Sequence, residues 1–585
     1  MYTLGINAVY HDSAACLVDD GEVVAAVEDE RFTHVKHGKR PVPFSTWELP
    51  FHAIDYCLAE AGIRLRDVDR IAYSFDPRLL DAWSELDTIE LPLQPSLHRQ
   101  ASGHESPWDP LFLSYVVNAP RQLVSGAPHH LRQRFADVDL AWVEPRWRFV
   151  EHHLAHEASA FLAAPFEETA VLSMDGRGER ATTSFGHYAR GDYRRLRQYV
   201  LPHSLGLVYE DVTGYLGFLH SSDEYKVMAL ASFGKPRYLE DFRRIVRAGG
   251  GGYEVTPTDL VERFGPARQR GGPMEPRHYD IARSLQAVLE ETVVGMAEWL
   301  HAETACPNLA MAGGVALNCV MNARVRDLGP FERVWVQPAA GDAGTALGSA
   351  LWVDHTERRD REAGAREAGR RYSMTHAYLG PAFDDDEIEG FLKWSKLPYR
   401  RLDDIADETA ALLAQDRIVG WFQGRMEFGP RALGARSILA SPIHPDMQAR
   451  LNEIKDREDF RPVAPAVLRE RAAEWFRCRR PSGFDAPFML FVFDVLEEQA
   501  ERIPAVCHVD GTARVQTVAR AAHPLYHALL SAFEERTGVP ILVNTSFNTR
   551  GEPIVCTPRD AVECFWTSPL DALVIGSFLL EKAPS

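Results

Sequence analysis

Residues 149–159 read Phe149-Val-Glu-His-His-Leu-Ala-His-Glu-Ala-Ser159 and place a short strand directly before a helix. The strand is predicted at 147–150, after which Ala, Leu and Phe recur at helical spacing through Phe161. His152 and His156 are four residues apart, so a helix carries both imidazoles on one face, one turn apart. That spacing is typical of two metal ligands.

The segments that follow supply carboxylates for the same site. The next predicted strand, 170–174, ends in Asp175-Gly176, and a strand that ends there delivers a carboxylate beside the helix. Asp342 is a second candidate, because it lies in a glycine-rich turn that opens a helix. Two imidazoles with one or two carboxylates suit a hard-to-intermediate divalent metal. The alternative is a helix start with capping and surface histidines, and the carboxylates favour the metal.

Length and composition limit the class of protein. A chain of 585 residues is too long for one core, so two or more domains are expected. The net charge of −19, from 64 Lys+Arg against 83 Asp+Glu, argues against general nucleic-acid binding. We find no apolar run of membrane-spanning length and no signal peptide, so we expect no membrane partner. The 8 cysteines form no Cys-x-x-Cys pair, which predicts buried thiols in a reducing cytoplasm and argues against a zinc ribbon.

The first thirty residues predict strand, polar turn, strand, which is how ATPases of the actin and sugar-kinase type begin. The strands are predicted at 2–7, 14–18 and 22–27. His11 and Asp12 lie in the first turn, either as ordinary turn residues or as a base over a cleft. The basic cluster 36–40 is either a solvated face or a phosphate contact.

Further along, glycine marks a second turn. A predicted strand from Asn308 runs into Gly313-Gly314, where the missing side chains let the backbone approach a ribose or phosphate closely. Residues 79–130 are irregular, and we interpret them as an elaboration that could set acceptor specificity. Residues 358–371 are poor in apolar side chains. They predict a first domain at 1–357, a linker at 358–374 and a second domain at 375–585.

The second domain carries basic side chains on several constrained loops. Arg425, Arg431 and Arg436 stand among glycines and a proline, and fixed guanidinium groups match phosphate geometry. Further basic residues are Lys455, Arg457, Arg461 and Arg514. The predicted strand 541–548 ends in amide and hydroxyl groups suited to a ribose or a carbamoyl group. The alternative is a set of surface Arg–carboxylate pairs, and several such loops in one domain favour an anion site.

The order of these motifs resembles the NodU/CmcH-type O-carbamoyltransferases along nearly the whole chain, with 79–130 the least covered part. The matching segments of the first domain are Gly5-Ile-Asn through Ser13, Glu28-Asp-Glu-Arg-Phe, His152-His-Leu-Ala-His156, Asp175-Gly176, Lys226-Val-Met-Ala-Leu-Ala, Gly313-Gly-Val-Ala-Leu-Asn318 and Gly341-Asp-Ala-Gly-Thr-Ala-Leu-Gly348. Those of the second are Gly424-Arg-Met-Glu-Phe-Gly-Pro-Arg-Ala-Leu-Gly434, Asp459-Phe-Arg-Pro462 and Val543-Asn-Thr-Ser-Phe-Asn548.

The resemblance implies an α/β chain in which a duplicated, actin-like ATPase (ASKHA) domain precedes a YrdC-like α/β domain. Whether the last segment of the second domain packs against the first domain is left open. In this family the YrdC-like domain joins carbamoyl phosphate and ATP, with Mg²⁺, into carbamoyl-adenylate and releases pyrophosphate. The actin-like domain then moves the carbamoyl group to a hydroxyl of a small molecule.

The resemblance also implies residue roles. The family's metal, usually iron, corresponds to His152, His156, Asp175 and Asp342. The adenylate contacts correspond to Lys36, Gly176, Gly206, Gly313, Gly314 and Asn318. The contacts with carbamoyl phosphate and ATP correspond to Arg431, Lys455, Arg461, Arg514, Asn544 and Ser546. His11 matches the acceptor-side histidine, and Asp12 beside it is the second catalytic candidate.

Other functions remain open from the sequence alone. A carbamoyl transfer of the tRNA-threonylcarbamoyl type is disfavoured by the acidic balance, and one of the hydrogenase-maturation type by the missing Cys-x-x-Cys pairs. A non-enzymatic ATP-gated binding or assembly protein has no need of the arginine-rich second domain. The acceptor is left open between an antibiotic, a macrolide, an aminoglycoside and an oligosaccharide, and a homodimer is also open.

Overall fold

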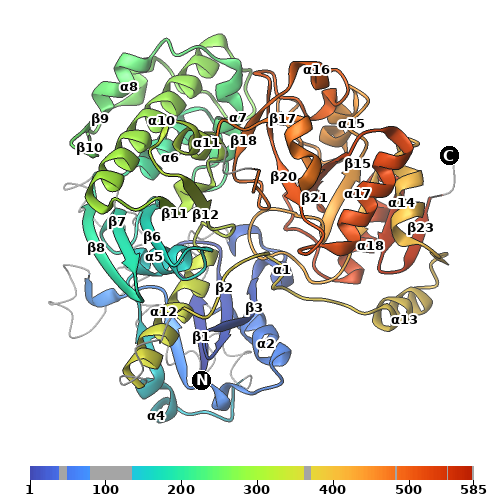
Figure 1. The fold of residues 1–585 in the computed structure, drawn as a ribbon, viewed down its shortest axis with the longest axis horizontal. Helices are drawn as coiled ribbons and strands as arrows, with labels where there is room; N and C mark the ends of the chain where they lie inside the picture. The colour runs from blue at the N-terminus through green and yellow to red at the C-terminus, as the bar shows by residue number, and fades with distance from the viewer. Residues whose placement is uncertain (39–48, 80–134, 362–369, 481–483, 550, 583–585) are drawn as a thin grey trace. The chain divides into compact units, whose positions relative to one another are not determined.

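The computed structural model describes residues 1–38, 49–79, 135–361, 370–480, 484–549 and 551–582 and divides into two compact units (Figure 1). Unit 1 comprises Met1–Val227 and Lys235–Met374, and unit 2 comprises Met228–Gly234 and Thr375–Ser585. Nearly all of the predicted elaboration, and residues 362–369 of the predicted linker, lie outside the described residues. No described helix is long and apolar enough to cross a membrane.

Unit 1 contains two five-stranded sheets of the same topology. The strand orders are β3-β2-β1-β4-β5 and β8-β7-β6-β11-β12. The first sheet has β1 (Tyr2–Asn7), β2 (Ala14–Asp19), β3 (Glu22–Glu28), β4 (Arg70–Tyr73) and β5 (Trp147–Phe149). The second has β6 (Glu168–Met174), β7 (Ala181–Ala189), β8 (Asp192–Val200), β11 (Asn308–Ala312) and β12 (Arg333–Val336). In each, three successive strands pair antiparallel and two later strands join in parallel. This repeat confirms the predicted duplicated, actin-like α/β fold.

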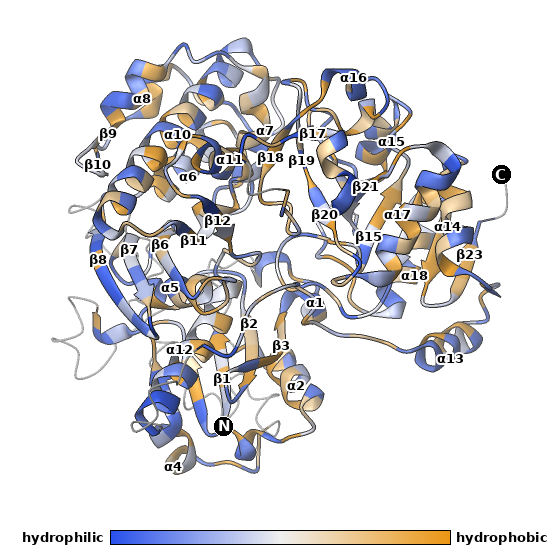
Figure 2. Ribbon diagram, in the orientation of Figure 1, coloured by the Kyte–Doolittle hydropathy of each residue, from blue (hydrophilic) through white to orange (hydrophobic). Residues whose placement is uncertain are grey.

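The strands follow the distribution of apolar side chains. Leu4 and Ile6 of β1, and Leu17 of β2, are fully buried. In Figure 2 β8 is largely blue, in keeping with its run of arginines, whereas β2 and β3 are mostly pale or orange. β8 therefore forms a polar edge, and the apolar core lies under the central strands.

Two helices exchange partners between the sheets. α5 (His152–Phe161) follows β5 of the first sheet but packs on β6, β7 and β11 of the second. α12 (Ala343–Arg361) follows β12 of the second sheet but packs on β1, β2 and β4 of the first. The two helices also pack on each other, at Gly348, where a Cβ would collide with the carbonyl oxygen of Ala155. Both helices therefore begin where the two repeats, and their two sheets, meet.

The remaining longer helices of unit 1 include α2 (Phe51–Glu60), α6 (Leu205–Tyr215), α8 (Leu239–Ile245), α10 (Pro276–Thr304) and α11 (Cys319–Leu328). α2 packs on β2 and β3, and α10 packs on β6. α7 (Glu224–Leu230) spans the boundary between the two units. α12 continues to Arg361, so the first four residues of the predicted linker are helical instead. Arg358 is buried there against Asp354, which explains why its charge does not mark a linker. All eight cysteines are free thiols and six are buried.

Unit 2 is built on an eight-stranded mixed sheet, β13-β23-β22-β14-β15-β21-β16-β20. Its strands are β13 (Arg400–Arg401), β14 (Val419–Phe422), β15 (Arg436–Ala440), β16 (Ala464–Leu468), β20 (Gln516–Val518), β21 (Ile541–Ser546), β22 (Ala572–Ile575) and β23 (Phe578–Glu581). A smaller sheet joins β17 (Phe476–Arg477), β18 (Val492–Val495) and β19 (Thr512–Arg514). The longer helices are α13 (Asp385–Ser395), α14 (Ile405–Leu413), α15 (Met447–Ile454), α17 (Pro524–Thr537) and α18 (Pro558–Thr567). The YrdC likeness of this unit stays a prediction.

The contact between α12 and α5 predicts an unequal response to alanine at two helical glycines. Gly348→Ala should lower the free energy of unfolding by about 1–3 kcal/mol, because the added methyl group overpacks the crossing. Gly295 of α10 has open space around its Cβ position, so Gly295→Ala should be neutral or stabilising by up to about 1 kcal/mol. Chemical denaturation of both variants measures the difference. Equal effects of the two substitutions would contradict the close crossing.

Candidate metal centre and active site

His152, His156, Asp175 and Asp342 converge into one buried cluster. Its ligand atoms all lie within 4.8 Å of one another. His152 Nε2 is 3.7 Å from Asp175 Oδ2 and 3.6 Å from Asp342 Oδ1. His156 Nε2 is 4.0 Å and 3.5 Å from the same two oxygens. Both imidazoles are fully buried, which excludes surface histidines.

The donor atoms of the cluster fit a metal ion. The Nε2 atoms of both histidines and both carboxylate oxygens of Asp342 are buried without a hydrogen-bond partner. Such atoms cost free energy unless a ligand satisfies them. His152 Nδ1 lies 3.2 Å from the carbonyl oxygen of Ser74, to which it can donate, and this leaves the lone pair of Nε2 facing the cluster. These residues therefore match a divalent-metal site with nitrogen and oxygen ligands.

The two carboxylates of the cluster favour a positive charge beside them. Burial alone would lower the pKa of His152, but the Asp342 and Asp175 carboxylates outweigh it and raise that pKa well above its ordinary value.

Glu179 lies beside this cluster and is also buried. Burial raises its pKa to about 7, although His152 and backbone N–H groups oppose the shift. Its Oε1 accepts the N–H groups of Asp76 and His152, at 2.6 Å and 3.0 Å. Glu179 therefore ties the end of β4 and the start of α5 to the turn after β6.

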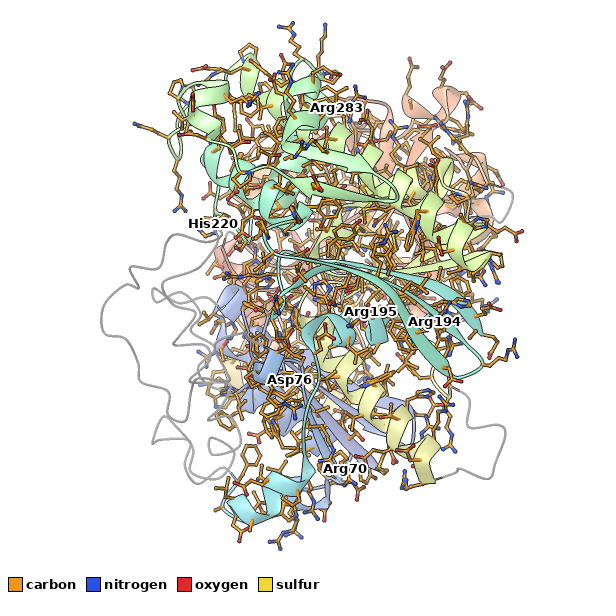
Figure 3. The ribbon with its side chains drawn as sticks, turned by 90° about the vertical axis from the view of Figure 1, so that its left-hand side faces the viewer. Arg70, Asp76, Arg194, Arg195, His220 and Arg283 are labelled. Carbon is orange, nitrogen blue, oxygen red and sulfur yellow. The ribbon has the colours of Figure 1, made fainter. Side chains whose placement is uncertain are left out.

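An arginine of the second sheet holds α5 through two of its glutamate neighbours. Arg195 of β8 donates Nε and Nη2 to the two carboxylate oxygens of Glu157, at 3.1 Å and 2.6 Å, and Nη1 to Glu151 at 2.7 Å. Figure 3 labels Arg195 on β8. Glu157 is fully buried, whereas the Arg195 side chain is 27% exposed, so the carboxylate end of this forked pair is shielded from water. It fixes the rotation of α5, and with it the direction of His152 and His156.

The turn between β1 and β2 carries His11 and Asp12 to the same cluster. His11 Nδ1 lies 3.0 Å from Asp12 Oδ2, and His11 Nε2 is 3.8 Å from Asp342 Oδ2. Asn7, fully buried at the end of β1, donates its amide to the carbonyl oxygens of His11 and Asp12, each at 3.0 Å. The hydroxyl of Tyr10 donates to the carbonyl oxygen of Gly178 at 2.7 Å. The loop between β1 and β2 is therefore joined directly to the loop between β6 and β7.

The predicted adenylate residues of unit 1 gather around Asp175. Gly314 N–H donates to Asp175 Oδ1 at 2.8 Å. Gly313 has a φ of +89° and packs against the backbone of Met174, so a side chain there would collide. The N-terminus of α6 brings Gly206 so close to Gly176 that a Cβ on Gly206 would lie 2.7 Å from the Gly176 backbone. The four glycines, which come from three segments, therefore lie around the turn at Asp175, and their adenylate role stays a prediction.

Asn318 and Lys36 take less direct positions. Asn318 caps α11 by accepting the N–H of Met321 at 2.9 Å, and its amide pairs reciprocally with that of Gln286 on α10. Tyr209 of α6 donates its hydroxyl to Gln286 Oε1 at 3.1 Å. Lys36 lies in the short helical turn Lys36–Gly38, next to His37, whose Nδ1 is 2.8 Å from Asp12 Oδ1. Lys36 therefore lies in the segment that contacts the loop of His11 and Asp12.

In unit 2 two of the predicted anion ligands have structural roles. Arg436 is fully buried and donates to the carbonyl oxygens of Gln423, Gly424 and Pro381. Its guanidinium also lies 3.6 Å from the centre of the Phe422 ring. Arg425 donates to the carbonyl oxygen of Leu379 at 2.7 Å. The expectation that Arg436 faces phosphate is therefore wrong, because its guanidinium is buried and bonded to backbone carbonyl oxygens, whereas a phosphate contact of Arg425 stays a prediction.

Lys455, Asn544 and Ser546 lie together around β21. The Lys455 ammonium donates to Ser546 Oγ at 3.0 Å and to Asn548 Oδ1 at 2.6 Å. Asn544 is paired with Gln516 at 2.8 Å and is nearly fully buried. Arg431, Arg461 and Arg514 come from three separate segments: the loop before β15, the loop before β16, and β19. Their joint role as an anion site stays a prediction.

Several supporting residues escaped the sequence analysis. Glu179, Arg195 and Gln286 carried no signal, because a charge or amide on a strand or helix is usually a solvated group. Asn7 stood inside a matched motif, and a polar residue at the end of an apolar strand could have singled it out. His37 was visible only as part of a basic cluster.

Comparison with known proteins identifies the family of this chain. A family model described as the carbamoyltransferase N-terminus matches residues 2–351, and one described as the carbamoyltransferase C-terminus matches residues 410–582. The chain belongs to the carbamoyltransferase family. It is therefore a member of a transferase family, and the resemblance that the motifs indicated is confirmed.

Relatives match this carbamoyltransferase over nearly its whole length. The Synechocystis protein sll1178 is 40% identical over 99% of this chain and 97% of its own. Nodulation protein NolNO of Sinorhizobium fredii is 38% identical over 98% of this chain and 80% of its own. Among solved structures, T. kodakarensis HypF matches 63% of this chain and 49% of that chain, with 14% identity and a TM-score of 0.32.

The cluster predicts that the purified carbamoyltransferase contains a divalent metal. Replacing both His152 and His156 by alanine should remove most of it, because two of the four ligands are lost. His153→Ala is the matched control, since this buried histidine of the same helix is not one of the four clustered residues, and its Nδ1 lies 3.1 Å from Ser184 Oγ. Elemental analysis by mass spectrometry gives the metal content. Equal metal in the double variant and the wild type would remove the assignment.

Proposed function

We propose that this protein is an ATP-dependent O-carbamoyltransferase whose acceptor is a hydroxyl of a small molecule, such as a natural product. The observation that carries the proposal is the position of His11. Its Nδ1 lies 3.0 Å from Asp12, and its Nε2 lies at the edge of the candidate metal cluster, 3.8 Å from Asp342 Oδ2. The family match supports the carbamoyl group as the unit transferred.

The first half-reaction activates the carbamoyl group. Carbamoyl phosphate is a poor carbamoyl donor toward an alcohol, and an adenylate has a better leaving group. Carbamoyl phosphate, ATP and water give carbamoyl-adenylate, pyrophosphate and phosphate. Two phosphorylated reactants bring many negative charges together, so a site with several fixed cations is required. The proposal assigns this step to unit 2, with Arg431, Lys455, Arg461, Arg514, Asn544 and Ser546.

The second half-reaction transfers the group and is assigned to unit 1. The hydroxyl oxygen of the acceptor attacks the carbamoyl carbon, its proton passes to His11 Nε2, and AMP leaves with the electron pair of the broken C–O bond. Asp12 holds the Nδ1–H of His11, so that Nε2 has its lone pair free. The glycine turns around Asp175, with Lys36 and Asn318, are proposed to hold the adenylate.

Iron(II) is the metal that the proposal places in the cluster of His152, His156, Asp175 and Asp342. Two imidazoles and two carboxylates suit it. A bound divalent ion supplies Lewis acidity toward a carbonyl or phosphoryl oxygen. Mg²⁺ is expected with ATP in unit 2.

Arginines of unit 2 test the first half-reaction. Arg461→Ala and Arg514→Ala should each slow carbamoyl-phosphate-dependent pyrophosphate release about 10²-fold or more, since each removes a charge-assisted contact with phosphate. Arg477→Ala is the control, because this exposed arginine stands in the same small sheet as Arg514. Pyrophosphate release at the wild-type rate in both test variants would contradict the phosphate site.

His11 tests whether the half-reactions are separable. His11→Asn should still form carbamoyl-adenylate but should carbamoylate the acceptor about 10²–10⁴-fold more slowly, as expected for a missing general base. Pyrophosphate release and product formation are measured side by side on protein that melts like the wild type. If product formation is unchanged, His11 is not the base; if both activities fall together, its role is structural.

The acceptor itself is found by mass spectrometry. Hydroxylated candidates, from macrolides and aminoglycosides to oligosaccharides, are incubated with enzyme, ATP and carbamoyl phosphate. A gain of one carbamoyl group that requires both co-substrates identifies the acceptor. Pyrophosphate release that depends on carbamoyl phosphate separates this enzyme from an ATP-gated binding protein.

A further inference from the structure

The carboxylate of Asp12 is shared between two histidines. Its Oδ2 lies 3.0 Å from His11 Nδ1, and its Oδ1 lies 2.8 Å from His37 Nδ1. The main chain adds a third bond, because Asp12 N–H donates to the carbonyl oxygen of His37 at 3.1 Å. A carboxylate is only an acceptor when ionised, so each neutral imidazole donates its Nδ1–H and keeps its lone pair on Nε2.

The backbone at this contact is strained on both sides. Asp12 has a φ of +52° and His37 a φ of +60°, which is left-handed for both residues. Such positions are unfavourable for residues other than glycine, and they persist only where surrounding bonds over-determine them. Asn7 holds the Asp12 side of the contact, and Glu30 accepts the N–H of His37 at 2.6 Å on the other. Strain maintained by so many bonds, beside a candidate catalytic histidine, indicates a functional requirement.

We propose that His37 is a positioning residue for carbamoyl transfer. By bonding the second oxygen of Asp12 it fixes the plane of that carboxylate, and the fixed carboxylate holds His11 in the tautomer that presents Nε2 as the base. The inference rests on the proposed function of His11.

Three substitutions separate positioning from a direct chemical role. Asn places its amide nitrogen close to the position of imidazole Nδ1 and tolerates a positive φ. His37→Asn should therefore keep most of the transfer activity. His37→Ala removes the donor, and His37→Gln places its nitrogen nearer the Nε2 position. Both should lower the kcat of transfer about 10–100-fold, the usual cost of losing a partner that orients a functional ligand. The KM for the acceptor and adenylate formation should change little.

A second readout needs no acceptor. In protein labelled with ¹⁵N-histidine, NMR reports the tautomer of His11, whose signals are assigned by their loss in His11→Asn. The wild type should show the Nδ1–H form, His37→Asn should keep it, and His37→Ala should show a mixture of tautomers.

The results divide cleanly between this inference and the proposed function. An unchanged His11 tautomer or an unchanged transfer rate in His37→Ala would overturn the inference, and so would a His37→Asn variant as slow as His37→Ala. Failure of the wild type to carbamoylate any hydroxyl would instead overturn the proposed function, and the NMR comparison would still test the positioning.

Discussion

The crossing of α5 and α12 is the constraint on which the candidate metal centre depends. Each helix leaves its own sheet and packs on the sheet of the other repeat, so both must start at the junction. That start places His152 and His156 on one helix opposite Asp342 before the other. Gly348 permits the close approach. A wider crossing would separate imidazoles from carboxylate and leave buried, unsatisfied polar atoms in place of a ligand set.

The duplication also gives each repeat a carboxylate in the loop between its first two strands. Asp12 lies in the loop between β1 and β2, and Asp175 lies directly after β6, in the corresponding loop of the second sheet. The surroundings then separate their chemistry. Asp175 faces two imidazoles and the backbone of Gly314, whereas Asp12 faces His11 and His37. The bond from Tyr10 to Gly178 couples the two turns, so one repeat's turn cannot move without the other.

Local patterns predicted the residues of the site better than its support. His152 and His156 were legible because a four-residue spacing fixes their common face, and Asp175 because an apolar strand ends there. The exchange of α5 and α12 could not be predicted, since it depends on contacts far apart in sequence. Arg436 misled for a physical reason: a guanidinium on a glycine-rich loop satisfies carbonyl oxygens as readily as phosphate. The pairing of Arg195 with Glu157 could not be predicted either, because the two residues lie on different elements that only the fold brings together.

β8, the strand whose arginine supports α5, also lies at the edge of its sheet. β8 is the outer strand of its sheet, and an outer strand exposes unpaired backbone groups to which another chain can add. Here Arg194 and Arg197 stand along it, and its pairing with β7 shifts register near Gly186. Like charges and an irregular ladder both oppose strand addition. The strand that orients α5 therefore carries features that disfavour extension of its sheet by a second copy of this chain.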